Sequence, residues 1–108
     1  MRWLLTLAII LAASVSWAAE VRLKWDAPYD GCAVKNYKIY YGTIPARPSK
    51  VLIVPDQLTA TVTGLTAGET YFFKATAVHL DGKESSFSNE ISETVPLPIG
   101  PQNLTEGE

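Results

Sequence analysis

The sequence predicts an all-β domain, and three observations support that prediction. Hydrophobic and polar residues alternate along several segments, as in Val21-x-Leu23-x-Trp25 and Tyr37-x-Ile39-x-Tyr41, which is the side-chain period of a half-buried strand. No segment after residue 18 has a convincing helical period. Prolines and glycine-containing turns separate the alternating segments, so we expect a series of short strands.

Residues 1–18 are predicted to be a signal peptide that is not part of the fold. Met1-Arg2 supplies a positive end, an apolar run follows, and Ser16-Trp17-Ala18 places small residues before a cut at Ala19. Such a leader directs export to the periplasm or out of the cell and is then cleaved off. The alternative, an uncleaved anchor, is disfavoured because the apolar run is short of the roughly 20 residues of a membrane span and no basic residues flank its far side.

The remaining residues suffice for one domain, which we place at 19–96, followed by a tail at 97–108. The net charge of −2 argues against a nucleic-acid or anionic-membrane partner, because both attract a basic surface. Stable membrane insertion after signal cleavage is not expected. The single Cys32 cannot form an internal disulfide, and it is predicted to be a buried thiol, a labile surface thiol or a link to another chain.

The first half of the domain is predicted to contain three strands. Val21–Trp25 points alternate apolar residues inward until Pro28 ends the strand. After a loop, Tyr37–Tyr41 directs Tyr37, Ile39 and Tyr41 inward. Gly42 and two prolines then break the chain, and Lys50–Val54 forms the third strand.

Three further strands are predicted in the second half. Thr59–Thr63 is rich in β-branched residues, and Tyr71–Val78 is the longest strand, with Tyr71, Phe73, Ala75 and Ala77 on one face. Asp81-Gly82 is a turn signal, and Asn89–Val95 closes the sheet.

Several of these segments together resemble the fibronectin type III family, over about Val21–Val95. The resemblance rests on the two alternating motifs given above, on Leu65-Thr66-Ala67-Gly68-Glu69-Thr70-Tyr71-Phe72-Phe73, and on Glu84-Ser85-Ser86-Phe87-Ser88-Asn89-Glu90. It implies a two-sheet antiparallel immunoglobulin-like sandwich, with structural roles for Trp25 and Tyr37 in the core. It also implies that Leu65 and Tyr71 form the family's corner, in which the tyrosine hydroxyl bonds to nearby backbone.

The family's first strand, strand A, is missing from the front of the predicted domain or is supplied by another segment. Strand B at Val21 would then be an open edge, which is a template for another strand. The tail contains Leu97-Pro98-Ile99-Gly100-Pro101-Gln102-Asn103-Leu104-Thr105, which resembles the opening of a further strand A. Two interpretations remain open: the tail is a flexible end, or it fills the empty position of the next molecule in a head-to-tail stack.

Catalysis is not predicted. His79 is the only histidine, and its neighbours in sequence offer nothing to orient it as a base. No spacing of histidine, cysteine or acidic residues suggests a metal site, and no glycine-rich loop suggests a phosphate site. We therefore expect a protein that is not an enzyme and that needs no cofactor.

Binding is the expected class of function, and one sheet offers a surface. If Tyr37 and Tyr71 face inward, the alternation directs an amphipathic patch outward, made of Lys38, Tyr40, Phe72 and Lys74. Aromatic faces stack on sugar rings or anchor protein partners. In the competing interpretation, Tyr40 and Phe72 form a cross-strand pair or lie beneath a neighbouring strand and serve packing alone.

The loop between the last two strands adds Asp81, Lys83 and Phe87 as candidate binding residues. Where some family members carry an Arg-Gly-Asp triplet, this chain has Asp81-Gly82-Lys83, so cell attachment is not expected. We expect a non-catalytic extracytoplasmic binding or adhesion module for a polysaccharide or a protein. The alternative is a structural subunit that self-associates through the strand B edge and the tail; a weaker alternative makes Cys32 a redox-sensitive link between chains.

Overall fold

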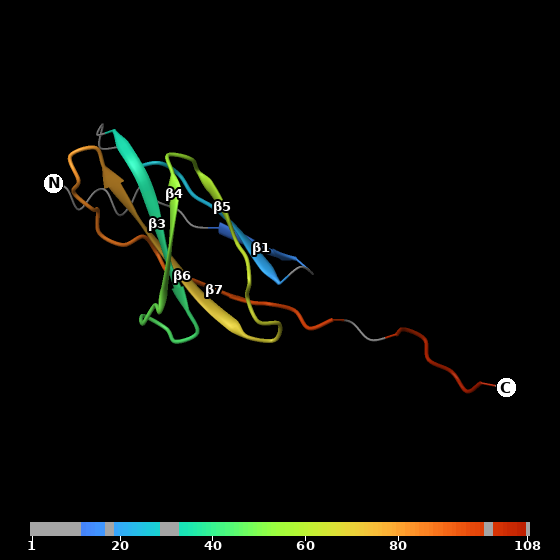
Figure 1. Ribbon diagram of the computed structural model, residues 1–108. Coiled ribbons are helices and arrows are strands. Elements are labelled where there is room, and N and C mark those ends of the chain that lie inside the picture. The colour runs from blue at the N-terminus through green and yellow to red at the C-terminus, as the bar shows by residue number, and fades with distance from the viewer. Residues whose placement is uncertain (1–11, 17–18, 29–32, 99–100, 108) are drawn as a thin grey trace.

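Two antiparallel sheets face each other in the computed structural model, which describes residues 12–16, 19–28, 33–98 and 101–107 (Figure 1). Within these residues the first sheet has the strand order β1-β2-β5, and the second has the order β4-β3-β6-β7. The two-sheet sandwich implied by the resemblance is therefore confirmed. The strands are β1 (Ala12–Ser16), β2 (Glu20–Lys24), β3 (Val34–Gly42), β4 (Lys50–Pro55), β5 (Thr59–Val62), β6 (Thr70–His79) and β7 (Ile91–Thr94).

In the first sheet, β1 occupies the position of strand A, for which the predicted domain at 19–96 contains no segment. β1 pairs antiparallel with β2, with Ala12 opposite Lys24 and Ser16 opposite Glu20. In the full-length chain, strand A is thus supplied by residues that the sequence places in the signal peptide. The open β2 edge was expected for a chain that begins at Ala19, and it is open only in a chain that lacks residues 12–16.

The second sheet is longer, and β3 and β6 form its centre. Both strands run beyond their predicted ends, because Val34 pairs with His79 after an irregularity between Val34 and Asn36. β4 lies at one end of the sheet and pairs only with β3 in continuous register, from Asn36 opposite Pro55 to Tyr41 opposite Lys50. β7 closes the other end and is shorter than the predicted Asn89–Val95.

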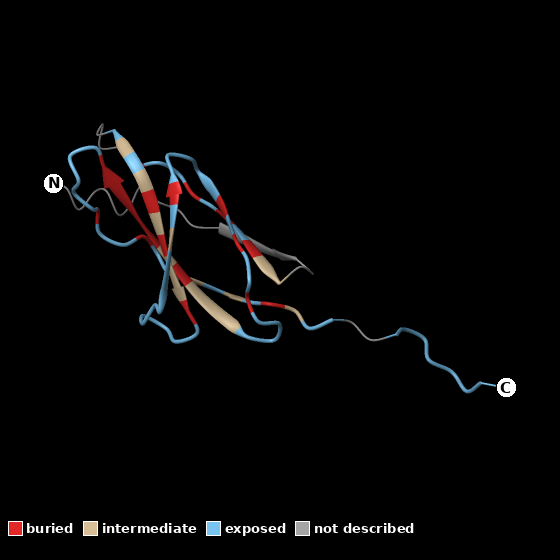
Figure 2. Cartoon of the chain, viewed as in Figure 1, coloured by how far each residue is buried: buried red, intermediate tan, exposed pale blue. Residues whose placement is uncertain are grey.

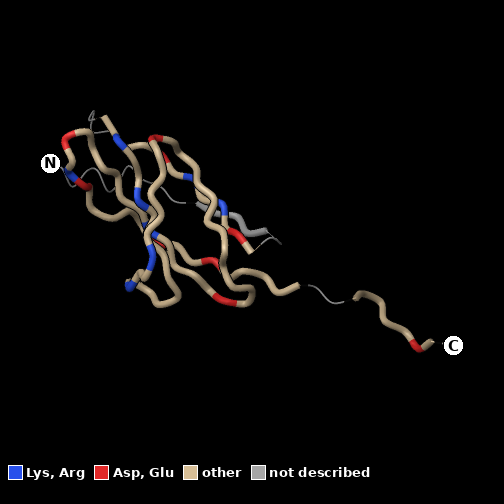
Figure 3. The backbone as a smooth tube through the Cα atoms, viewed as in Figure 1, with Lys and Arg blue, Asp and Glu red and all other residues tan. Residues whose placement is uncertain are grey.

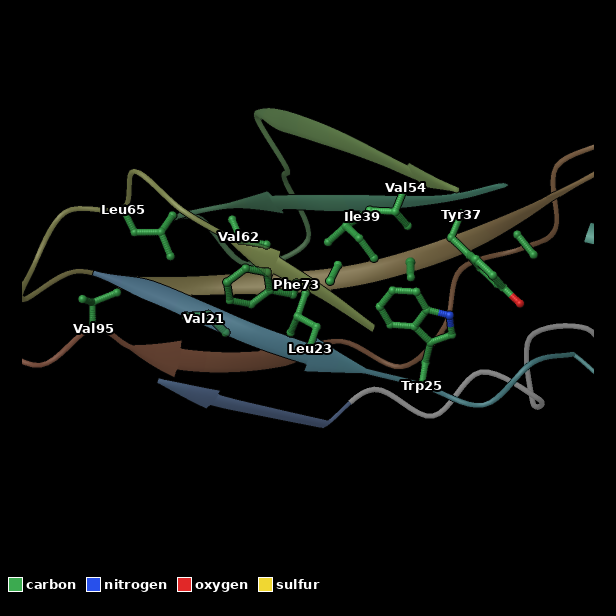
Figure 4. Packing of buried hydrophobic residues seen from close by; sticks show 13 residues of the cluster. Val21, Leu23, Trp25, Tyr37, Ile39, Val54, Val62, Leu65, Phe73 and Val95 are labelled. Atoms are coloured by element: carbon green, nitrogen blue, oxygen red, sulfur yellow. The ribbon is translucent and has the colours of Figure 1, made fainter. Parts of the chain in front are cut away.

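The core lies between the sheets and is built from the alternating residues. Val21 and Leu23 of β2, and Trp25 directly after it, meet Tyr37, Ile39 and Phe73 of the second sheet (Figure 4). All six are at most 4% exposed. The rings of Trp25 and Tyr37 lie 5.3 Å apart in a tilted pair, which adds to the stabilisation from burial of their area. Tyr41 and Tyr71, also expected inward, pack against this core but are only partly buried.

The corner before β6 has the bond that the resemblance implies. The Tyr71 hydroxyl accepts a hydrogen bond from the Thr66 amide at 2.9 Å, and Leu65 is buried beneath the turn. Gly68 has a φ of 88°, in the left-handed region that glycine tolerates best. Its amide donates to the Val95 carbonyl at 2.7 Å, which ties the corner to the end of β7.

The tail leaves the sandwich at Pro96. Figure 2 shows residues 101–107 exposed and extending away from the two sheets. These residues contain no strand, so the strand-A-like interpretation has no counterpart within one chain. Among the described residues, no helix has the length and apolar character of a membrane span.

Candidate functional site

The outer face of the second sheet brings the predicted patch together. Lys38 and Tyr40 on β3 lie beside Phe72 and Lys74 on β6, and all four side chains are half-buried. Tyr40 is opposite Lys74, whereas Phe72 is opposite Gly42. Tyr40 and Phe72 are therefore diagonal cross-strand neighbours rather than directly opposite residues.

The segment after the turn, residues 84–90, folds along β6 through two serines. Ser85 donates from its amide to the Ala77 carbonyl at 2.8 Å, and its hydroxyl accepts from the Ala77 amide at 2.9 Å. Ser88 makes the same two bonds with Ala75, at 2.8 and 2.9 Å. Each hydroxyl takes the place of a backbone carbonyl of a regular ladder. The segment can thus follow β6 without being a strand.

Phe87 lies between Ser85 and Ser88 in the chain, and its side chain lies over the outer face of the second sheet. Its ring meets Tyr40 edge-on, with centroids 5.1 Å apart and an interplanar angle of 84°. The Lys74 ammonium lies 4.0 Å from the centre of the Phe87 ring, a cation–π contact. Phe87 remains 40% exposed, so this ring, and not Tyr40 alone, offers aromatic surface to a ligand.

Glu84 fixes the start of the same segment to the sheet. Its carboxylate accepts hydrogen bonds from the Tyr40 hydroxyl at 2.5 Å and from the Thr76 hydroxyl at 2.7 Å. The Lys38 ammonium donates to the other oxygen at 3.4 Å. This role of Glu84 has no signal in the sequence, because the four residues come together only when β3, β6 and the segment are assembled.

These contacts also set the charges of the site. Partial burial raises the pKa of Glu84, but the bonds from Tyr40 and Thr76 and the charge of Lys38 outweigh it and lower the pKa below that of a free glutamate. Burial, followed by the bond to Glu84 and its charge, raises the pKa of the Tyr40 hydroxyl. At neutral pH the pair is an ionised carboxylate and a protonated phenol.

β4 adds apolar surface that the sequence analysis did not assign to the site. Val51 lies opposite Tyr40, and Ile53 lies opposite Lys38, so both belong to the outer face. They are 50% and 60% exposed. The signal was present in Lys50-Val51-Leu52-Ile53-Val54-Pro55, which is aliphatic on both faces of the strand rather than alternating.

The loop residues Asp81 and Lys83 form a turn. The Asp81 carboxylate accepts from the Lys83 amide at 2.9 Å, and the His79 amide donates to the Lys83 carbonyl at 2.9 Å. This use of aspartate is typical of turn geometry. Of the predicted loop residues, Phe87 is the one that reaches the Tyr40 patch in these contacts. Cys32 lies outside the described residues.

Charge does not single out another site. Figure 3 shows acidic and basic residues spread over both sheets. In the described ranges, no group of three or more histidine, cysteine or acidic side chains is placed to hold a metal ion. The outer face of the second sheet, comprising Lys38, Tyr40, Val51, Ile53, Phe72, Lys74, Glu84 and Phe87, is the candidate site and is called the aromatic face below.

Known proteins match most of this chain. A sequence model of the fibronectin type III domain matches residues 10–94. Chitinase D from Niallia circulans is 38% identical over 85 residues, which are 78% of this chain and 15% of the chitinase. Amylopullulanase from Thermoanaerobacter thermohydrosulfuricus is 34% identical over 88 residues, which are 81% of this chain and 6% of that enzyme. The chain therefore spans only a small part of these relatives.

A solved structure agrees in fold. An Fn3-like protein from Clostridium thermocellum superposes with a TM-score of 0.68 at 22% identity, covering 84% of this chain and 93% of that one. At this identity the likeness concerns the sandwich and not the ligand.

Proposed function

This chain belongs to the fibronectin type III family, and from that premise we propose that it is a non-catalytic extracytoplasmic module that binds polysaccharide through its aromatic face. Fibronectin type III is a module fold and not a catalytic one. Function on such a scaffold depends on the side chains that one surface presents. The proposal includes export through the apolar leader at residues 1–18.

The observation that carries the proposal is the exposed ring of Phe87, which is held against Tyr40 and the Lys74 ammonium. A sugar ring has an apolar face that packs on an aromatic ring and hydroxyls that bond to charged groups at its rim. Lys38, Lys74 and Glu84 supply those groups around the rings. Because Glu84 and Lys74 fix the rings before a ligand arrives, little side-chain entropy is lost on binding.

Two of the relatives favour a polysaccharide as the ligand. They are, by their names, a chitinase and an amylopullulanase, and the matched region is a small part of each. A non-catalytic module in such an enzyme has substrate polymer close by. A protein partner is the second candidate, because the same aromatic and aliphatic surface suits a protein interface.

The test is retention of the purified protein on insoluble chitin and insoluble starch. Phe87→Ala and Phe72→Ala each remove a ring from the aromatic face, and we expect retention to weaken by about tenfold. Leu80→Ala is the matched control, since Leu80 is 68% exposed and lies in the turn after β6. Thermal melting of each variant shows that the fold is intact.

The outcomes separate the candidates. Binding that Phe87→Ala and Phe72→Ala weaken and Leu80→Ala leaves unchanged supports the proposal. Binding that none of the three changes rules out the aromatic face. Absence of binding to either polymer, combined with capture of an envelope protein that Phe87→Ala abolishes, moves the function to protein recognition through the same surface.

A further inference from the structure

We propose that the outer edge of β4 pairs with β4 of a second copy of this chain, joining two second sheets into one continuous eight-stranded sheet. β4 is the end strand of its sheet, so its outer side carries backbone amides and carbonyls that no strand of the same sheet satisfies. Such an edge is a template for another strand. The proposal does not depend on the ligand of the aromatic face.

β4 lacks the usual protection of an edge strand. Natural sheets blunt their edges with charges, prolines, bulges or very short strands. Residues 51–54 are four consecutive aliphatic residues, and the charge of Lys50 and the ring of Pro55 lie only at the two ends. The register with β3 is continuous, so no bulge twists the edge away. Val51 and Ile53 are half or more exposed.

The opposite edge of the same sheet is different. β7 presents Ser92, Glu93 and Thr94 after Ile91, and polar residues at an edge disfavour pairing. The β4 edge is therefore aliphatic and the β7 edge is mostly polar, which favours association through β4.

The partner follows from the strand's own sequence. In an antiparallel pair about a two-fold axis, residues of the same face must lie opposite each other. The register that places Leu52 opposite Leu52 of the second copy also places Val51 opposite Ile53 and Lys50 opposite Val54. Both exposed aliphatic residues then find an aliphatic partner, the two lysines avoid each other, and Pro55, which has no amide hydrogen, stays outside the five paired residues.

The neighbouring registers are worse. A shift toward the start of the strand places Ile53 opposite Ser49, and a shift toward its end places Val51 opposite Pro55, which cannot donate to the ladder. One strand pair buries less than the roughly 1,600 Å² of a standard interface. We therefore expect a weak, reversible dimer with a dissociation constant in the micromolar range or weaker.

The test is sedimentation of the purified protein over a concentration series, from about 5 µM to 1 mM. Ile53→Glu places a charge opposite Val51 of the second copy and, within its own chain, opposite Lys38, so the monomer tolerates it. We expect the dissociation constant to rise by about tenfold or more, because the change occurs twice in a symmetric pair. Leu104→Glu, at an 88% exposed leucine of the tail, is the matched control and should leave association unchanged.

Hydrogen exchange of the unchanged protein provides a second readout. Amides of residues 51–54 should gain protection as concentration rises. A monomer at every concentration overturns the proposal, and so does association that Leu104→Glu abolishes and Ile53→Glu does not, which points to the tail. If the protein fails to bind chitin or starch but still dimerises in sedimentation, the proposed function is wrong and the β4 dimer is supported.

Discussion

At the scale of single residues, Glu84 is the group on which the aromatic face depends most. It receives hydrogen bonds from Tyr40, Thr76 and Lys38, and it is the residue through which the segment 84–90 begins its path over the sheet. We expect Glu84→Gln to lower the free energy of unfolding by about 1 kcal/mol at pH 7, because the amide NH₂ that replaces one oxygen cannot accept from the Lys38 ammonium and the attraction of the carboxylate charge is lost. Urea unfolding measures the change, and Glu69→Gln, at an exposed turn residue, is the control.

The pH dependence of the same variant has a defined sign. The pKa of Glu84 is lower in the folded protein than in the unfolded chain. Its contribution is therefore present above the unfolded pKa and is lost as pH falls through the folded pKa. The difference in stability between the wild type and Glu84→Gln should shrink in that acidic window. A difference that stays constant down to pH 3 would contradict the role given to the carboxylate.

At the scale of elements, the two serines explain how a segment without strand geometry is held against β6. Ser85 and Ser88 are buried, and each closes two bonds with one β6 residue. Replacing either with alanine leaves a buried β6 amide without an acceptor, which costs about 1 to 3 kcal/mol. We expect Ser88→Ala to destabilise the protein by that amount in urea unfolding. Ser92→Ala, at an exposed position of β7, should change stability by less than about 0.5 kcal/mol.

A second readout separates this role from general packing. Because Phe87 adjoins Ser88, loosening the segment should also release the ring from Lys74 and Tyr40. We expect hydrogen exchange of the Ala75 amide to speed up more than that of β3. Equal acceleration across the sheet would show instead that the substitution acts through overall stability.

The strands and the serine segment differ in how far the sequence could predict them. Each predicted strand overlaps an observed one, because alternation reports a half-buried face directly. The path of residues 84–90 has no such period, since it depends on bonds from Ser85 and Ser88 to residues eight and thirteen positions earlier. The resemblance to a family marked the segment but gave no geometry for it.

The sequence predicted which aromatic and basic residues share the aromatic face, but not the contacts that hold them or the aliphatic residues beside them. Alternation placed Tyr40, Phe72 and the two lysines on one face. The contacts of Glu84, and the exposure of Val51 and Ile53, depend on which chain segment covers which strand, and a one-dimensional pattern does not contain that information. For the same reason, an apolar run at the N-terminus cannot be assigned to export or to a strand from its hydrophobicity alone.

At the scale of the whole molecule, residues 12–16 connect export with folding. They pair with β2 in the full-length chain, and they lie within the predicted signal peptide. Cleavage at Ala19 removes β1 and leaves the outer side of β2 unpaired. We expect a chain that begins at Ala19 to be less stable than one that begins at Ala12, by about 2 kcal/mol, because it loses one strand pairing and gains an open edge.

Hydrogen exchange of Glu20–Lys24 is the decisive measurement on these two chains. Faster exchange in the shorter chain at all concentrations means that β1 alone protects the edge. Protection that returns as concentration rises, and that Leu104→Glu removes, means that the tail of another molecule takes the place of β1. In that case the head-to-tail subunit gains support, because residues 101–107 extend away from their own sandwich (Figure 1). Equal protection in both chains would show that β2 does not need a partner on that side.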